Sequence, residues 1–257
     1  MSEQLRDALS QLRAHSTKRD RDNLVRFGIT AKSALGVSMA NIQKQAKALG
    51  RNHALACALW DSGCYEARLL TAFVAEPGRV TPAQMERWCK QFDNWAVCDT
   101  LCFFLFDRVP HAWEKIRKWS KQEPEFVKRC AFALMASIAG HDQQASDEQF
   151  LEGLTFIERA AKDDRNFVKK ALSWALRRIG RRNRALNRAA VELSLRLAAS
   201  SDARERWLGR GAHKELTSAL VERTLSSRKA SQKKTARPQR AAKSIPKKKA
   251  VTRASRG

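Results

Sequence analysis

Trp95 and Asp99 stand four residues apart in the segment FDNWAVCDTLC (92–102), which otherwise has the composition of a core helix. At this spacing both side chains lie on one face of a helix, one turn apart. An aromatic face attracts a cation, and a carboxylate can stabilise a developing positive charge or orient a water molecule. The pair therefore suits chemistry at a positively charged centre.

A purine alkylated at N3 or N7 is such a centre, because its base carries a positive charge and is a good leaving group. Its release requires a group that stabilises the charge developing on the sugar and orients water. Asp99, Arg129 and Lys170 fall at similar positions in successive apolar segments, and Trp174 follows in the last one. The structural alternative is that Asp99 and Arg129 form an ion pair without a catalytic role.

The elements that position these residues are predicted to be helices, because no segment shows sustained strand alternation. Ser146 and Gln149 have the spacing of a capping box at the start of a helix. Asp93 is predicted to cap the helix that carries Trp95. Gly and Pro residues separate the helices, which leaves short connections between them.

The helices also recur along the chain. Segments 125–140 and 166–180 share Phe-Val-Lys at an offset of 41 residues, which is within the period of HEAT-type helical hairpins. We predict an all-α fold, an α-solenoid of about six HEAT-like antiparallel helix pairs with a concave basic surface. A compact all-α bundle is the alternative.

The net charge of +24 is unevenly placed along the 257 residues. Residues 226–257 contain twelve Lys or Arg and no acid, so the rest carries 50 − 12 = 38 basic and 26 acidic residues, or +12. Both parts favour a polyanionic partner. We predict a repeat domain over 1–225 and a disordered Lys/Arg-rich tail over 226–257 that attracts phosphates, with a merely solubilising tail as the alternative.

The six cysteines form no Cys-x-x-Cys pair, and no histidine has a partner at metal-ligand spacing. Cys98 and Cys102 can share one helix face, but two thiols do not make a zinc site. We therefore expect buried, reduced thiols and neither a metal nor another cofactor. The N-terminus lacks the apolar core of a signal peptide, and the apolar runs are too short to cross a bilayer. These features indicate a cytoplasmic, nucleoid-associated protein with no membrane partner.

The chain resembles the DNA alkylation repair enzymes of the AlkD type, which are HEAT-repeat DNA glycosylases. The resemblance covers most of residues 20–200, and FDNWAVCDTLC, EFVKRCAFALMA and NFVKKALSWALRRIG carry it. It implies the excision of cationic N3- and N7-alkylated purines without a metal. It also implies that the lesion is held on a concave basic surface.

By position, the resemblance implies that Asp99 is the catalytic carboxylate and that Trp95 and Trp174 flank the lesion and its sugar. An aromatic residue from the N-terminal region of the family has only Phe27 as a loose counterpart. The basic residues expected to bind DNA phosphates are Arg129, Arg177, Lys170, Lys128 and Lys169.

We therefore predict a monofunctional DNA-alkylpurine glycosylase, a monomer whose partner is double-stranded DNA containing alkylated purines. A non-catalytic HEAT-repeat protein that recognises unusual DNA structures is the first alternative. A solenoid that binds protein or RNA is the second. Base release from methylated duplex separates the enzyme from the first alternative, and preference for DNA over an acidic peptide separates both from the second.

Overall fold

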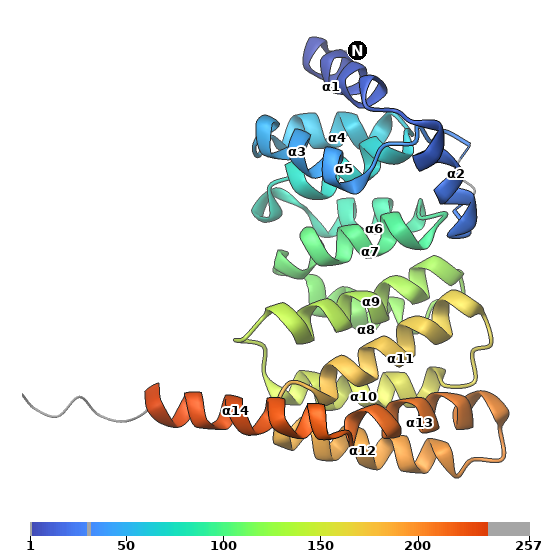
Figure 1. Ribbon diagram of the computed structural model, residues 1–257, viewed down its shortest axis with the longest axis vertical. Coiled ribbons are helices and arrows are strands. Elements are labelled where there is room, and N and C mark those ends of the chain that lie inside the picture. The colour runs from blue at the N-terminus through green and yellow to red at the C-terminus, as the bar shows by residue number, and fades with distance from the viewer. Residues whose placement is uncertain (1, 30–31, 236–257) are drawn as a thin grey trace, which may run out of the picture.

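The computed structural model of the chain describes residues 2–29 and 32–235, with side chains described as far as residue 227. All the regular secondary structure of these residues is helical (Figure 1), so the predicted all-α class is confirmed. The helices are α1 (Glu3–Ala14), α2 (Lys18–Arg26), α3 (Met39–Leu49), α4 (His53–Asp61), α5 (Tyr65–Val74), α6 (Pro82–Lys90), α7 (Trp95–Phe104), α8 (Ala112–Trp119), α9 (Glu125–His141), α10 (Asp147–Ala160), α11 (Asn166–Gly180), α12 (Arg184–Ala198), α13 (Ala203–Leu216) and α14 (Ala219–Thr235). Two 3-10 helices, η1 (Pro77–Arg79) and η2 (Phe106–Arg108), lie in connections.

The helices α4 to α13 form successive pairs that stack along one axis. The second helix of each pair contacts the second helix of the next, in the order α5, α7, α9, α11 and α13. Figure 1 shows this stack running from α4 and α5 down to α12 and α13. The chain is an α-solenoid of HEAT-like helix pairs, as predicted. The described residues give five regular pairs flanked by α1–α3 and α14, where the sequence predicts about six.

Large aromatic side chains fill the core between successive pairs. Trp60, Trp88 and Trp119 are fully buried, and the rings of Trp60 and Trp88 stack at a centroid distance of 5.1 Å. Trp113 is also buried, whereas Trp207 is 49% exposed. These five tryptophans therefore lie in the core or at its edge. The apolar side chains packed between successive helix pairs hold the pairs in a fixed relative position.

The start of α7 lies one residue later than predicted. Asn94, with extended backbone at φ −151° and ψ 159°, is the residue before the helix, and its side chain accepts a hydrogen bond from the Val97 amide at 3.0 Å. Asp93 instead accepts a hydrogen bond from the Asn94 side-chain amide at 2.7 Å. The prediction that Asp93 caps α7 is thus wrong, while the capping box of Ser146 and Gln149 is present.

The C-terminal part of the predicted domain continues into α14, which crosses residue 226 and extends to Thr235. Val221 and Leu225 are buried, so the first turns of α14 belong to the packed solenoid. The rest of the predicted tail, residues 236–257, lies outside the described residues. No helix among the described residues has the length and apolar character that a membrane span requires.

Candidate active site and DNA interface

Trp95, Asp99 and Phe103 form a half-buried stripe along α7, at intervals of four residues. All three are half-buried, whereas Cys98 and Leu101 on the same helix are fully buried. The helix therefore packs one face into the solenoid core and turns this stripe outward. The predicted pairing of Trp95 with Asp99 on one face is what the structure shows.

Asp99 forms a two-point ion pair with Arg129 of α9. Arg129 donates from Nε to Oδ1 at 3.0 Å and from Nη2 to Oδ2 at 2.6 Å, and its Nη1 donates to the Phe167 carbonyl at 2.7 Å. The Arg129 residue is only 6% exposed, while the Asp99 side chain is 18% exposed. The two hydrogen bonds hold both carboxylate oxygens in place. Because the Asp99 side chain is 18% exposed, part of the carboxylate stays accessible from outside the protein.

Burial raises the pKa of Asp99 to about 7, and the neighbouring Cys98 adds to the rise, while Arg129 opposes it. Burial acts against the charged form of Arg129 as well, but the attraction of Asp99 outweighs it and raises the pKa of Arg129. The carboxylate is therefore poorly hydrated and depends on one cation for its ionised form. A dehydrated carboxylate interacts more strongly with a nearby positive charge than one in bulk water.

A pocket of about 360 Å³ opens in front of Asp99 and Trp95. Trp95 donates from Nε1 to the Phe27 carbonyl at 3.1 Å, and Phe27, which is 61% exposed, lines the same pocket. The opposite walls include Asp20, Asn23, Leu24, Met39, Ile42 and Tyr65. The N-terminal region thus brings an aromatic residue to the carboxylate, as the loose counterpart at Phe27 implies.

The wall made by α2 and the segment before α3 is held by one buried carboxylate, Glu66. Its Oε1 accepts from the backbone amides of Leu35, Gly36 and Val37 at 3.0, 2.7 and 3.3 Å. Gly36 has a φ of 85°, and a Cβ there would lie 2.6 Å from the Thr17 carbonyl oxygen. Only glycine fits this turn, and the turn sets α2 beside the pocket.

Trp174 lies toward the other end of the α7 stripe. Its ring stacks on Phe103 at a centroid distance of 4.8 Å and an interplanar angle of 2°. Phe103 in turn meets the edge of the His141 ring at 5.3 Å. Because Phe103 is one turn beyond Asp99, the two predicted tryptophans stand on either side of the carboxylate rather than together in one pocket.

Two of the five predicted phosphate-binding residues are cations of α9 that already have acidic partners. Arg129 donates two hydrogen bonds to Asp99 and is therefore engaged by the carboxylate. Lys128, whose side chain is 12% exposed, pairs with Asp163 at 3.4 Å and with Glu123 at 3.7 Å. Neither side chain is free to meet a phosphate in this conformation.

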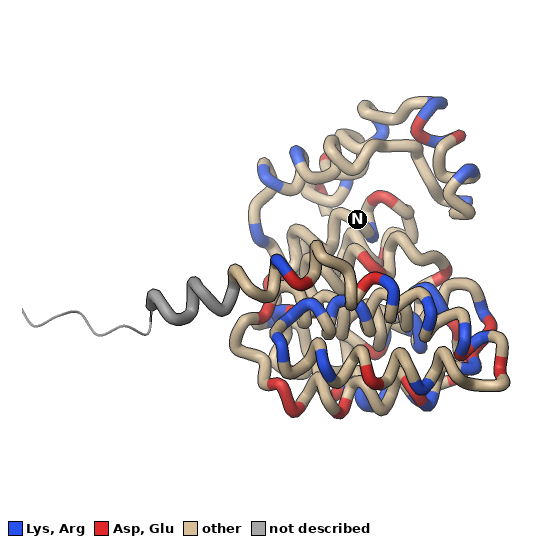
Figure 2. The backbone as a smooth tube through the Cα atoms, turned by 60° about the horizontal axis from the view of Figure 1, so that its bottom comes forward, with Lys and Arg blue, Asp and Glu red and all other residues tan. Residues whose placement is uncertain are grey.

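The three predicted cations of α11 differ in their surroundings. Arg177 pairs with Glu215 at 3.1 Å, and the ammonium of Lys169 lies over the Trp207 ring at 5.5 Å. Lys170 is exposed and forms no ion pair within the described part of the chain. Figure 2 shows the Lys and Arg positions spread along the helices and interleaved with Asp and Glu positions.

Phe103, Glu215 and the ion-pair partners contributed by neighbouring helix pairs were not predicted from the sequence. The sequence spacing does indicate Phe103, since it lies one turn beyond Asp99, just as Asp99 lies one turn beyond Trp95. No sequence pattern indicates Glu215, because its ion pair with Arg177 depends on how α13 is rotated against α11.

A comparison with known protein families identifies the family to which this chain belongs. Residues 8–216 match the family described as DNA alkylation repair enzyme. The chain belongs to this family. No curated protein sequence matches it significantly.

One solved structure shows the same architecture as this DNA alkylation repair family member. The chain is similar, with 17% identity and a TM-score of 0.73, to a member of a family related to the HEAT-like repeat DNA glycosylases with affinity for branched DNA structures; the match covers 86% of this chain and 95% of the other. A designed armadillo repeat protein in complex with the peptide (KR)4 matches at 14% identity and a TM-score of 0.37, over 94% of each chain. The first likeness establishes the HEAT-like fold.

Proposed function

We propose that this DNA alkylation repair protein is a monofunctional glycosylase that hydrolyses the N-glycosidic bond of cationic N3- and N7-alkylated purines in double-stranded DNA. The observation that supports this most is the placement of Asp99. Its carboxylate is fixed at two points by Arg129, is partly dehydrated and lines an open pocket beside Trp95. A fixed, poorly hydrated anion is suited to stabilising positive charge in a transition state.

In this reaction the C1′–N bond breaks and the base leaves with its electron pair, which cancels the positive charge of the alkylated ring. Asp99 stabilises the positive charge that develops on the sugar and accepts a hydrogen bond from the attacking water. The water oxygen bonds to C1′ and loses a proton. Trp95 and Trp174 offer aromatic faces on either side of this centre, where they attract the cationic base.

Arg129 acts as a positioning residue in this proposal rather than as a phosphate ligand. Lys170 is the predicted cation that is exposed and unpaired among the described residues, and we assign it to a DNA phosphate. Arg177, Lys128 and Lys169 would have to exchange their present partners for phosphates, which makes their contribution to affinity smaller.

A non-catalytic role in recognising branched DNA is the second candidate. The similar solved structure belongs to a family with affinity for branched DNA structures. The closed Asp99–Arg129 pair also suits a structural role. Incubating the protein with methylated duplex and identifying any released base by mass distinguishes the two functions, since a non-catalytic protein releases no base above the spontaneous level.

We expect the aromatic faces of Trp95 and Trp174 and the carboxylate of Asp99 to determine which lesions the protein excises. Recognition through charge should favour 7-methylguanine and 3-methyladenine over hypoxanthine and uracil, which lack both the positive charge and the activated leaving group. Single-turnover excision from matched duplexes, one for each lesion, measures this preference. Efficient uracil release would contradict the proposal and indicate a site that reads the base edge.

The basic C-terminal segment is expected to raise DNA affinity without taking part in the reaction. Residues 236–257 contain eight Lys or Arg and no acid. A chain truncated after Thr235 keeps α14 and should bind duplex DNA more weakly, with the log–log salt slope reduced by about 0.9 for each phosphate that is no longer neutralised. Titrations at several salt concentrations measure the slope. The excision rate at saturating protein is the control, and a large fall in that rate would show that the segment acts in the reaction.

A further inference from the structure

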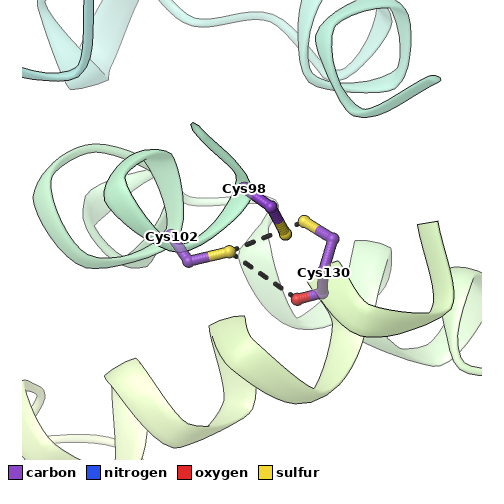
Figure 3. A group of neighbouring side chains, drawn as sticks. All are labelled: Cys98, Cys102 and Cys130. Carbon is purple, nitrogen blue, oxygen red and sulfur yellow. Dashed lines mark hydrogen bonds between the residues drawn. The ribbon is translucent and has the colours of Figure 1, made fainter. Parts of the chain in front are cut away.

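Three of the six cysteines meet in the core next to the Asp99–Arg129 pair, since Cys98 precedes Asp99 and Cys130 follows Arg129. The Sγ atoms of Cys98, Cys102 and Cys130 all lie within 4.8 Å of one another, and those of Cys102 and Cys130 are 3.6 Å apart. Figure 3 shows the three side chains pointing toward one another from α7 and α9. Cys89 of α6 lies beside Cys130.

We propose that Cys98, Cys102 and Cys130 bind one thiophilic metal ion, zinc or copper(I), which fastens α7 to α9 behind the active site. Thiolates are the ligands that select these soft ions. A zinc ion with Zn–S bonds of about 2.3 Å holds its sulfur atoms about 3.8 Å apart in a tetrahedral site. The distance of 3.6 Å between Cys102 and Cys130 is already close to this value.

The two metals differ in the number of ligands that they need. Zinc in a structural site takes four ligands, so it requires Cys89, which lies outside the group of three close thiols, to move in as the fourth. Copper(I) is satisfied by the three thiolates of Cys98, Cys102 and Cys130. In either case the ion replaces the thiol protons, which leave as H⁺, and no electron is transferred. Cys98 and Cys102 now donate to carbonyls of α9 at 3.9 and 3.7 Å, and these two weak bonds are lost on binding.

The surroundings suit buried thiolates better than a plain apolar core does. Arg129 directly precedes Cys130 on α9 and places a positive charge next to the three thiols. Arg129 also offsets part of the negative charge of the loaded site.

The sequence position of the ligands connects this site to the reaction centre. Cys98 directly precedes Asp99 on α7, and Cys130 directly follows Arg129 on α9. An ion that holds these two cysteines together therefore also fixes the distance between Asp99 and Arg129. The inference does not rest on the proposed glycosylase function, because metal binding is measured without DNA.

The test uses the full chain purified without chelator from cells supplied with zinc or with copper. We expect about one metal ion per chain by elemental analysis, bound in a site of sulfur ligands. Cys57→Ser is the matched control, because Cys57 lies on α4 outside the cluster and should leave the metal content unchanged. Cys102→Ser should remove most of the metal.

X-ray absorption at the metal edge keeps the test decisive if Cys102→Ser fails to fold. A first shell of four sulfurs, altered in Cys89→Ser, identifies zinc, and a shell of three sulfurs that Cys89→Ser leaves unchanged identifies copper(I). A wild-type protein that takes up neither metal, even when it is refolded in the presence of each, would overturn the proposal. So would a first shell of nitrogen and oxygen, or a mass lower by two hydrogens that shows a disulfide.

Discussion

Asp99→Asn should slow single-turnover excision of 7-methylguanine by about 10²–10³-fold, or roughly 3–4 kcal/mol in transition-state stabilisation. The amide keeps the size of the side chain and can still accept a hydrogen bond from Arg129, but it no longer stabilises a sugar cation. Removing a negative charge from the pocket should leave DNA affinity equal or slightly higher. The rate is measured at saturating protein, so that binding does not limit it.

The substitution also weakens the ion pair with Arg129, so a melting experiment must accompany the kinetics. Asp163→Asn is a matched control, because Asp163 pairs with Lys128 and Arg165 and lies outside the pocket. It should lower the melting temperature and leave excision per folded molecule unchanged. If folded Asp99→Asn protein behaves in the same way, the carboxylate is structural and the catalytic assignment fails.

Arg129→Met should be the most destabilising of these substitutions. It leaves Asp99 buried without its cation, which costs about 3–5 kcal/mol, or a fall in melting temperature of about 6–20 °C. Excision should fall as well, because the loss of Arg129 favours the protonated carboxyl and frees its orientation. Thermal melts and single-turnover rates on the same preparations measure both effects.

The double variant Asp99→Asn with Arg129→Met separates pairing from phosphate binding. If the two residues act as a pair, the double variant should be less destabilised than the sum of the single variants, because neither charge is left alone. A phosphate-binding Arg129 predicts a different pattern. In that case Arg129→Met would keep its melting temperature, and the salt slope of DNA binding would fall by the equivalent of about one phosphate.

Periodicity and repeat spacing predict a large part of the fold and the position of Trp95 and Asp99 on one face of α7. Asp99, Arg129 and Lys170 each stand at the fifth residue of their helices, and this common position follows from the repeat. The ion pair between the first two was one of the alternatives that the sequence offered. Whether the pair is catalytic cannot follow from spacing, because the same geometry serves both roles.

The details that the sequence did not predict depend on packing between helices. Cys130 joins Cys98 and Cys102 only because α9 is rotated so that residue 130 faces α7, and no pattern within one helix specifies that rotation. The start of α7 was ambiguous because Asp93 and Asn94 are both good capping residues. The change at Ser226 to a segment without acidic residues does not end the helix. Helix α14 continues to Thr235 because Lys, Arg and Ala favour a helix.

The Asp99–Arg129 ion pair joins two consecutive helix pairs, since Asp99 lies on α7 and Arg129 on α9. In a linear stack each unit contacts only its neighbours, so the geometry of this joint is insensitive to changes several units away. Changes in length or partners at either end of the stack can therefore leave the geometry of the Asp99–Arg129 pair unaltered. In the proposed glycosylase, this separation would let the ends of the stack change the DNA structures that they bind without altering the reaction centre.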